Sequence, residues 1–157
     1  MKIPIIFLLL VITPSVIFSS EGYRGLSPVN SSCSDVSKAF SVNVCGQAES
    51  EHNVENEKIV IVYSQSPCQK AWGKKWNVKS GTILSIERHL KKTILMTDLK
   101  IKWENLEKHI IESDIDEIMY YDKKNGIAYF TNSSRISTIY YFPTDDSSKF
   151  VCDENCK

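Results

Sequence analysis

The sequence predicts an α+β fold: a small antiparallel sheet with one short amphipathic helix packed on it. Three runs near the C-terminus, 117–121, 126–131 and 135–142, are rich in Ile, Tyr and Phe and read as strands. The segments between them are turn-like, because Asn125-Gly126 suits a tight hairpin and Asn132-Ser133-Ser134 has turn chemistry. Three adjacent strands with two short turns predict an antiparallel meander.

Earlier runs supply the other strands. Residues 58–63 are continuous and β-branched, which fits a strand buried on both faces. Residues 82–86 predict a second strand that runs toward Leu90. Residues 99–103 alternate between apolar and charged side chains, so an edge-like strand is expected there.

The spacing of the apolar residues changes at Trp103 from every second residue to every third or fourth, and this change predicts the helix. Trp103, Leu106 and Ile110 are spaced by three and four residues, which places them on one helical face. We therefore expect an amphipathic helix over 103–112, ended by Ser113-Asp114.

The N-terminal third divides into two parts. Residues 1–20 place Lys2 before about ten apolar residues and then small polar ones, the pattern of a secretory signal peptide. Residues 21–57 are polar and are expected to be irregular, with one possible strand at 39–44. The α+β domain is predicted at 58–157, outside the cytosol, in a secreted or periplasmic location, with no integral membrane segment after cleavage.

The cysteines fit export. Cys33, Cys45, Cys68, Cys152 and Cys156 all follow the predicted signal peptide, and disulfides are the default in an oxidising compartment. Cys33 and Cys45 could close a short loop, and Cys68 could pair with Cys152 or Cys156. Because the number is odd, at least one thiol stays free or pairs with another molecule. The spacing lacks the paired ligands of a zinc site, so no metal is predicted.

Aromatic and basic residues provide the candidate binding groups. The predicted strands carry Tyr121, Tyr129 and Tyr141, and tyrosine-rich surface suits peptides or sugars, although core packing is the alternative. Residues 70–79 interleave lysines with tryptophans and could contact anionic lipid, polysaccharide or nucleic acid, or form a solvated loop. The tentative binding residues of this segment are Trp72, Lys74, Lys75 and Trp76.

The sequence lacks a recognisable catalytic pattern. It has no G-x-S-x-G, H-E-x-x-H or P-loop motif, and its three histidines are scattered. The charges balance at 19 basic and 19 acidic residues, which argues against a dedicated polyanion binder and, with export, against a nucleic-acid partner. No catalytic residue and no cofactor are predicted.

The C-terminal half resembles a family of small exported bacterial proteins with no known activity. The resemblance covers about half of the chain, from Gly81 to Cys152, and implies export and an α+β fold only. It rests on the order of several short motifs: 83–92, Asp98-Leu99-Lys100-Ile101, Met119-Tyr120-Tyr121, Asn125-Gly126-Ile127-Ala128, Ile136, 139–144 and Phe150-Val151-Cys152.

These observations favour a non-enzymatic binding or interaction module outside the cytosol, with a protein or a polysaccharide at the cell surface as its partner. A small extracellular hydrolase, with an acid pair or cysteine site that spacing does not reveal, is the first alternative. A structural envelope protein is the second. An exposed aromatic cluster would favour binding, and a concave pocket with converging carboxylates or a histidine would favour catalysis.

Overall fold

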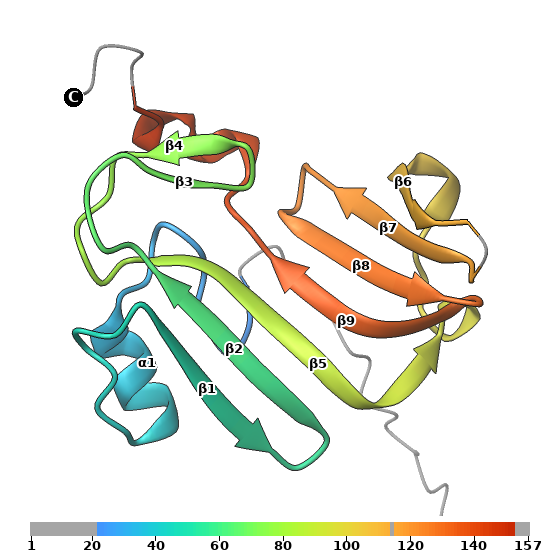
Figure 1. Cartoon of the computed structure of the whole chain (residues 1–157), viewed down its shortest axis with the longest axis horizontal. Helices are drawn as coiled ribbons and strands as arrows, with labels where there is room; N and C mark the ends of the chain where they lie inside the picture. Colours follow the sequence, from blue (N-terminus) through green and yellow to red (C-terminus); the bar gives the residue numbers. More distant parts are fainter. Residues whose placement is uncertain (1–21, 114, 153–157) are drawn as a thin grey trace, which may run out of the picture.

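A seven-stranded antiparallel sheet dominates the computed structural model, which describes residues 22–113 and 115–152 (Figure 1). The strand order is β1-β2-β5-β9-β8-β7-β6, and a separate hairpin pairs β3 with β4. The predicted antiparallel sheet is confirmed, but the fold is sheet-dominated rather than clearly α+β. The predicted signal peptide and Cys156 lie outside the described residues.

The first half of the sheet comes from β1 (Glu49–Val54), β2 (Glu57–Tyr63) and β5 (Ile83–Leu95). The predictions for 58–63 and 82–86 are confirmed, although β2 alternates buried and half-buried residues instead of being buried on both faces. Between β2 and β5 the chain forms the hairpin of β3 (Gln69–Ala71) and β4 (Lys74–Trp76).

The second half is a four-strand meander of β6 (Glu107–Glu112), β7 (Glu117–Asp122), β8 (Ile127–Asn132) and β9 (Arg135–Tyr141). The three predicted C-terminal strands are therefore confirmed. The chain leaves β5 through two 3-10 turns, η1 (Met96–Asp98) and η2 (Trp103–Asn105), and enters β6 at the far edge. The meander then returns, so that β9 pairs with β5.

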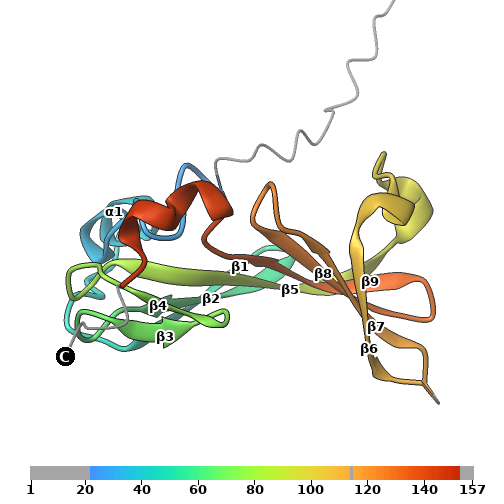
Figure 2. The same cartoon turned by 90° about the horizontal axis from the view of Figure 1, so that it is seen from above.

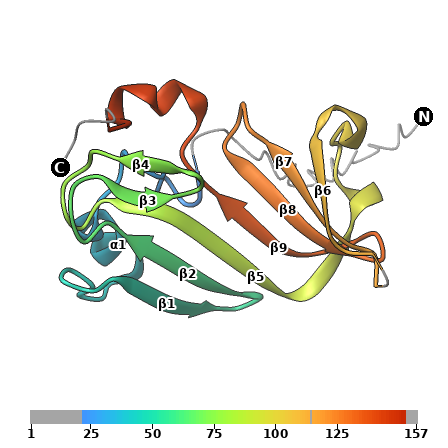
Figure 3. The same ribbon diagram turned by 45° about the horizontal axis from the view of Figure 1, so that its top comes forward.

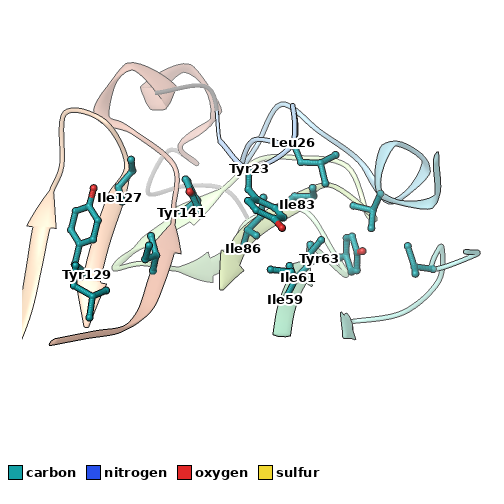
Figure 4. Packing of buried hydrophobic residues seen from close by; sticks show 14 residues of the cluster. Tyr23, Leu26, Ile59, Ile61, Tyr63, Ile83, Ile86, Ile127, Tyr129 and Tyr141 are labelled. Carbon is teal, nitrogen blue, oxygen red and sulfur yellow. The ribbon is translucent and has the colours of Figure 1, made fainter. Parts of the chain in front are cut away.

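The core lies on one face of this sheet. Residues opposite each other in an antiparallel ladder share a face, and one such row joins Ile61, Ile86, Tyr141 and Ile127. The N-terminal segment covers this row with Tyr23 and Leu26 (Figure 4), and helix α1 (Cys33–Phe40) adds Val36. Residues 22–57 thus pack into the same core as the sheet.

The only α-helix among the described residues lies at 33–40, not at 103–112. The predictions of an irregular 21–57 segment and of a strand at 39–44 were wrong, because α1 and β1 fall there. A start signal was present in the sequence: the Ser32 N–H donates to Asp35 Oδ2 at 2.8 Å, as in a capping box. Ser41, at φ 55°, ends the helix.

Residues 99–112 differ most from expectation. Leu99, Ile101 and Trp103 pack against the core from an irregular segment rather than from a strand, and residues 107–112 form β6 rather than a helix. Helical spacing was misleading because Ile110 is 63% exposed and contacts no core. A helix of this length is marginal alone, whereas the β-branched pair Ile110-Ile111 favours a strand that β7 can pair with.

Two disulfides link segments near the two ends of the described chain to the rest of the fold. Cys33–Cys45 holds the helix to the loop before β1, and Cys68–Cys152 joins the start of the β3–β4 hairpin to the C-terminal segment. That segment includes the 3-10 helix η3 (Asp145–Phe150), which lies beside the hairpin at one end of the sheet (Figure 3). Disulfides of this kind are typical of an extracytoplasmic protein.

Candidate binding surface

The hairpin β3–β4 lies on the opposite side of the sheet from α1 (Figure 2). Its two-residue loop is Trp72-Gly73, and both residues have positive φ, 51° and 79°. Such a loop normally carries Asn or Gly at its first position. A bulky side chain in the left-handed region costs about 1–2 kcal/mol, so contacts of the Trp72 ring must offset this strain.

The sheet beneath Trp72 is shaped to receive it. A row of opposite residues on this outer face runs Glu87, Tyr140, Ala128, Tyr121 and Glu107 across five strands. The small Ala128 side chain leaves a space between the two tyrosines. Ala128 is nevertheless 0% exposed, and Trp72 contacts the rings on both sides of it.

Four rings form a cluster that we call the aromatic surface: Trp72, Tyr121, Tyr140 and Phe142. Trp72 stacks on Phe142, with ring centroids 4.7 Å apart and planes 21° apart. It meets Tyr140 and Tyr121 edge-on at 5.7 and 6.5 Å. Each such pair contributes about 0.5–1.5 kcal/mol. Trp72, Tyr121 and Tyr140 remain half-buried, so the cluster reaches the protein surface.

Charged side chains lie beside Tyr121 of the aromatic surface. Glu107 lies 2.6 Å from Nε2 of His109 and 2.5 Å from Nζ of Lys123, while the His109 ring meets Tyr121 edge-on at 5.0 Å. The hydrogen bond from Lys123, followed by that from His109, lowers the pKa of Glu107. Burial raises the pKa of Tyr121. These side chains therefore offer both charges and hydrogen-bonding groups.

Lys74, two residues after Trp72 on the hairpin, pairs with Asp145 of η3 at 3.0 Å. Both side chains are exposed, so this ion pair adds little to stability. It does hold the hairpin that carries Trp72 to η3.

The structure brings together only some of the predicted binding residues. Trp72 and Tyr121 meet at the aromatic surface, and Lys74 and Lys75 are exposed on β4, which follows the Trp72-Gly73 loop. Trp76 is 1% exposed, in a small second core with Val78 and Leu84, and its Nε1 donates to the Ala71 carbonyl at 2.9 Å.

Tyr129 and Tyr141 are also interior, on the core face of the sheet. Burial raises the pKa of both phenols. Sequence reasoning chose Tyr141 as a binding residue and left out its neighbours Tyr140 and Phe142. Strand alternation shows that neighbouring residues face opposite ways, but only the register across β7, β8 and β9 reveals that Tyr140 shares the face of Tyr121.

A serine–histidine contact lies elsewhere, at β1. Ser50 Oγ is 2.8 Å from His52 Nε2 and 2.7 Å from the Tyr63 hydroxyl. This is the spacing of a nucleophile and its base, and a motif search does not detect it. All three side chains are buried, and Phe40 of α1 stacks on His52 at 4.1 Å. In this arrangement Ser50 has no access to a substrate, so we assign the contact to packing.

Comparison with known proteins adds no relative: no family model, no curated protein and no solved structure matches this chain. Within residues 22–113 and 115–152, no group of three His, Cys, Asp or Glu residues could hold a metal ion. No helix in those same residues is both long and apolar enough to cross a membrane.

Proposed function

We propose that this protein is an exported binding module that uses the aromatic surface to hold a protein or polysaccharide partner at the cell surface. One observation carries the proposal: Trp72 keeps a strained left-handed backbone in a loop where asparagine would be relaxed, and its ring completes a half-exposed cluster. Strained residues gather at functional sites.

The chemistry of the surface suits such partners. Tyrosine and tryptophan present large, rigid faces with a polar edge, which favours stacking on sugar rings and on peptide side chains. The neighbouring side chains of Glu107, Lys123 and His109 carry both signs of charge and supply hydrogen bonds without a strong field of one sign. Secretion by the predicted signal peptide would bring this surface to its partner.

Co-sedimentation with insoluble polysaccharides tests the proposal, together with binding to a peptide array. Chitin, cellulose and peptidoglycan are suitable polysaccharides. Tyr121→Ser should weaken binding about tenfold, because a hot-spot aromatic contributes about 2 kcal/mol or more to an interface. Tyr120→Ser is the matched control: it neighbours Tyr121 on β7 but packs on Trp103 on the other side of the sheet. Equal binding by the two variants would overturn the proposal.

A further inference from the structure

A cavity of about 400 Å³ lies at the edge of the core, and Trp72 is not among its lining residues. Its walls come from the N-terminal segment 22–30, the β7–β8 turn and the chain that follows β9. This volume is within the range of small-molecule sites, about 300–1,000 Å³. Three of the lining residues are glycines, which bring backbone close to the cavity.

The lining is neutral and rich in hydrogen-bonding groups. Its polar side chains are Ser27, Asn30, Asn125, Thr144 and Ser147, and none of the lining residues among 22–113 and 115–152 is charged. A charged ligand would lose its hydration here without a compensating charge, which is costly. A neutral ligand with several hydroxyl or amide groups would not incur that cost.

Several of these polar groups can form further hydrogen bonds with a ligand. The Ser27 hydroxyl has no hydrogen-bond partner among the described residues, since Ser27 bonds to Ser31 only through its backbone. The Asn30 amide makes one long contact, from Nδ2 to the Pro28 carbonyl at 3.4 Å. The Asn125 amide nitrogen donates to Asp122 at 2.8 Å, which leaves its oxygen free to accept.

One aromatic side chain, that of Tyr141, completes the wall. Arg88 Nη1 donates to the Tyr141 hydroxyl at 3.1 Å, which fixes that ring, whereas the Phe142 ring stacks on Trp72 and the Phe142 backbone carbonyl lies beside the lining residue Gly126. An aromatic ring beside hydroxyl and amide groups suits the apolar C–H face and the hydroxyls of a sugar ring. The turn holds this shape through Gly126: a Cβ there would lie 2.3 Å from the Phe142 carbonyl oxygen.

From the volume, the neutral lining and the fixed aromatic wall, we infer that this cavity binds a neutral, hydroxyl-rich small molecule of the monosaccharide class. The inference does not depend on the aromatic surface, although Phe142 belongs to both.

The test is a titration of the uniformly ¹⁵N-labelled full chain with glucose, galactose, mannose and N-acetylglucosamine, followed by NMR. Glucosamine and glucuronate serve as charged counterparts. At least one neutral sugar should shift the amide resonances of Gly22, Gly25 and Gly126. The double variant Ser27→Ala/Asn30→Ala should weaken that binding about tenfold, through the loss of two or more hydrogen bonds.

Asn53→Ala, at an exposed site on β1, is the control and should bind like the parent chain. Absence of shifts at all three glycines, or tighter binding of the charged counterparts, would overturn the inference. The Trp72 indole resonance separates the two sites. Shifts at the glycines alone support the cavity only, and shifts at Trp72 alone support the aromatic surface and overturn the cavity assignment.

Discussion

Arg88 on β5 donates from Nε to Oε2 of Glu57 on β2 at 2.8 Å, and the Tyr23 ring lies over the guanidinium with its centroid 4.7 Å away. The Tyr23 hydroxyl donates to the other Glu57 oxygen. Burial, followed by the hydrogen bond to Glu57, raises the pKa of Tyr23 to about 12. The Arg88–Glu57 ion pair thus anchors the N-terminal segment over the sheet through Tyr23. Nothing in the sequence predicts that these three residues meet.

Removing one member of this pair should destabilise the fold. Glu57→Gln leaves the Arg88 charge partly buried and without its counterion. We expect a loss of about 3 kcal/mol, the low end for buried pairs, because water still reaches both side chains. The double variant Glu57→Gln/Arg88→Met should recover much of that loss. Urea unfolding at pH 7 measures each variant.

The neighbouring strand pair β1–β2 offers a matched control. Lys58 and Glu51 pair at 2.7 Å on the exposed face. Glu51→Gln should cost less than about 1 kcal/mol, as surface ion pairs do. If Glu57→Gln costs no more than Glu51→Gln, the anchoring role assigned to Glu57 is wrong.

As the pH falls below neutrality, the free energy of unfolding of the protein should decrease because of His52. Burial lowers the pKa of His52 from its ordinary value of 6.5. In the window from pH 6.5 down to the folded-state pKa, the unfolded chain binds the proton and the folded chain does not. The free energy of unfolding therefore decreases as the pH falls through that window, and His52 contributes no pH dependence well above 6.5.

Urea unfolding at half-unit steps from pH 8 to pH 5 measures this effect. His52→Gln should flatten the profile between pH 6.5 and 5. A parent slope that survives in His52→Gln would assign the effect to other groups.

Much of the sheet could be predicted because its signals are local. The β-branched run at 58–63 and the Asn125-Gly126 turn each specify their element without help from distant residues. The pairing of β6 with β7 could not be predicted in this way. Trp103, Leu106 and Ile110 fit a helical face, but only the ladder shows that Ile110 points to solvent.

The residue types of the aromatic surface could be predicted from the sequence, but the contacts between them could not. Trp72 and Tyr121 stand out by residue type. Their contact with Tyr140 depends on the register that sets Ala128 between the tyrosines and on the docking of a distant hairpin. The alternation of β9 alone does not decide which of Tyr140 and Tyr141 faces the core.

Trp72 should behave as a surface residue in stability measurements. Trp72→Asn removes the ring contacts but also relieves the left-handed strain, because asparagine tolerates positive φ. We expect the free energy of unfolding of Trp72→Asn to exceed that of Trp72→Ala by about 1–2 kcal/mol at most. Trp76→Ala, four residues away in the second core, should cost about 3–5 kcal/mol. A Trp72→Asn loss as large as that of Trp76→Ala would make Trp72 a core residue and remove the argument for binding.

The two disulfides should differ in their contribution to stability. Cys33–Cys45 spans a sequence separation of 12 and Cys68–Cys152 one of 84. Loop-closure entropy then gives about 3 kcal/mol for the shorter loop and about 4.5 kcal/mol for the longer one. Paired Cys→Ser variants, compared by urea unfolding, should follow this order. The reverse order would show that local packing near α1 outweighs the entropy of the long loop.

Non-reducing peptide mapping tests the connectivity itself. The two bonds use four of the five cysteines, so Cys156 has no cysteine partner left within the chain. We expect the linked peptides Cys33–Cys45 and Cys68–Cys152 and one titratable thiol per denatured chain. A Cys68–Cys156 peptide would contradict the pairing, and with it the fixed position of η3 beside the hairpin. A dimer that separates on reduction would instead place Cys156 in a bond between chains.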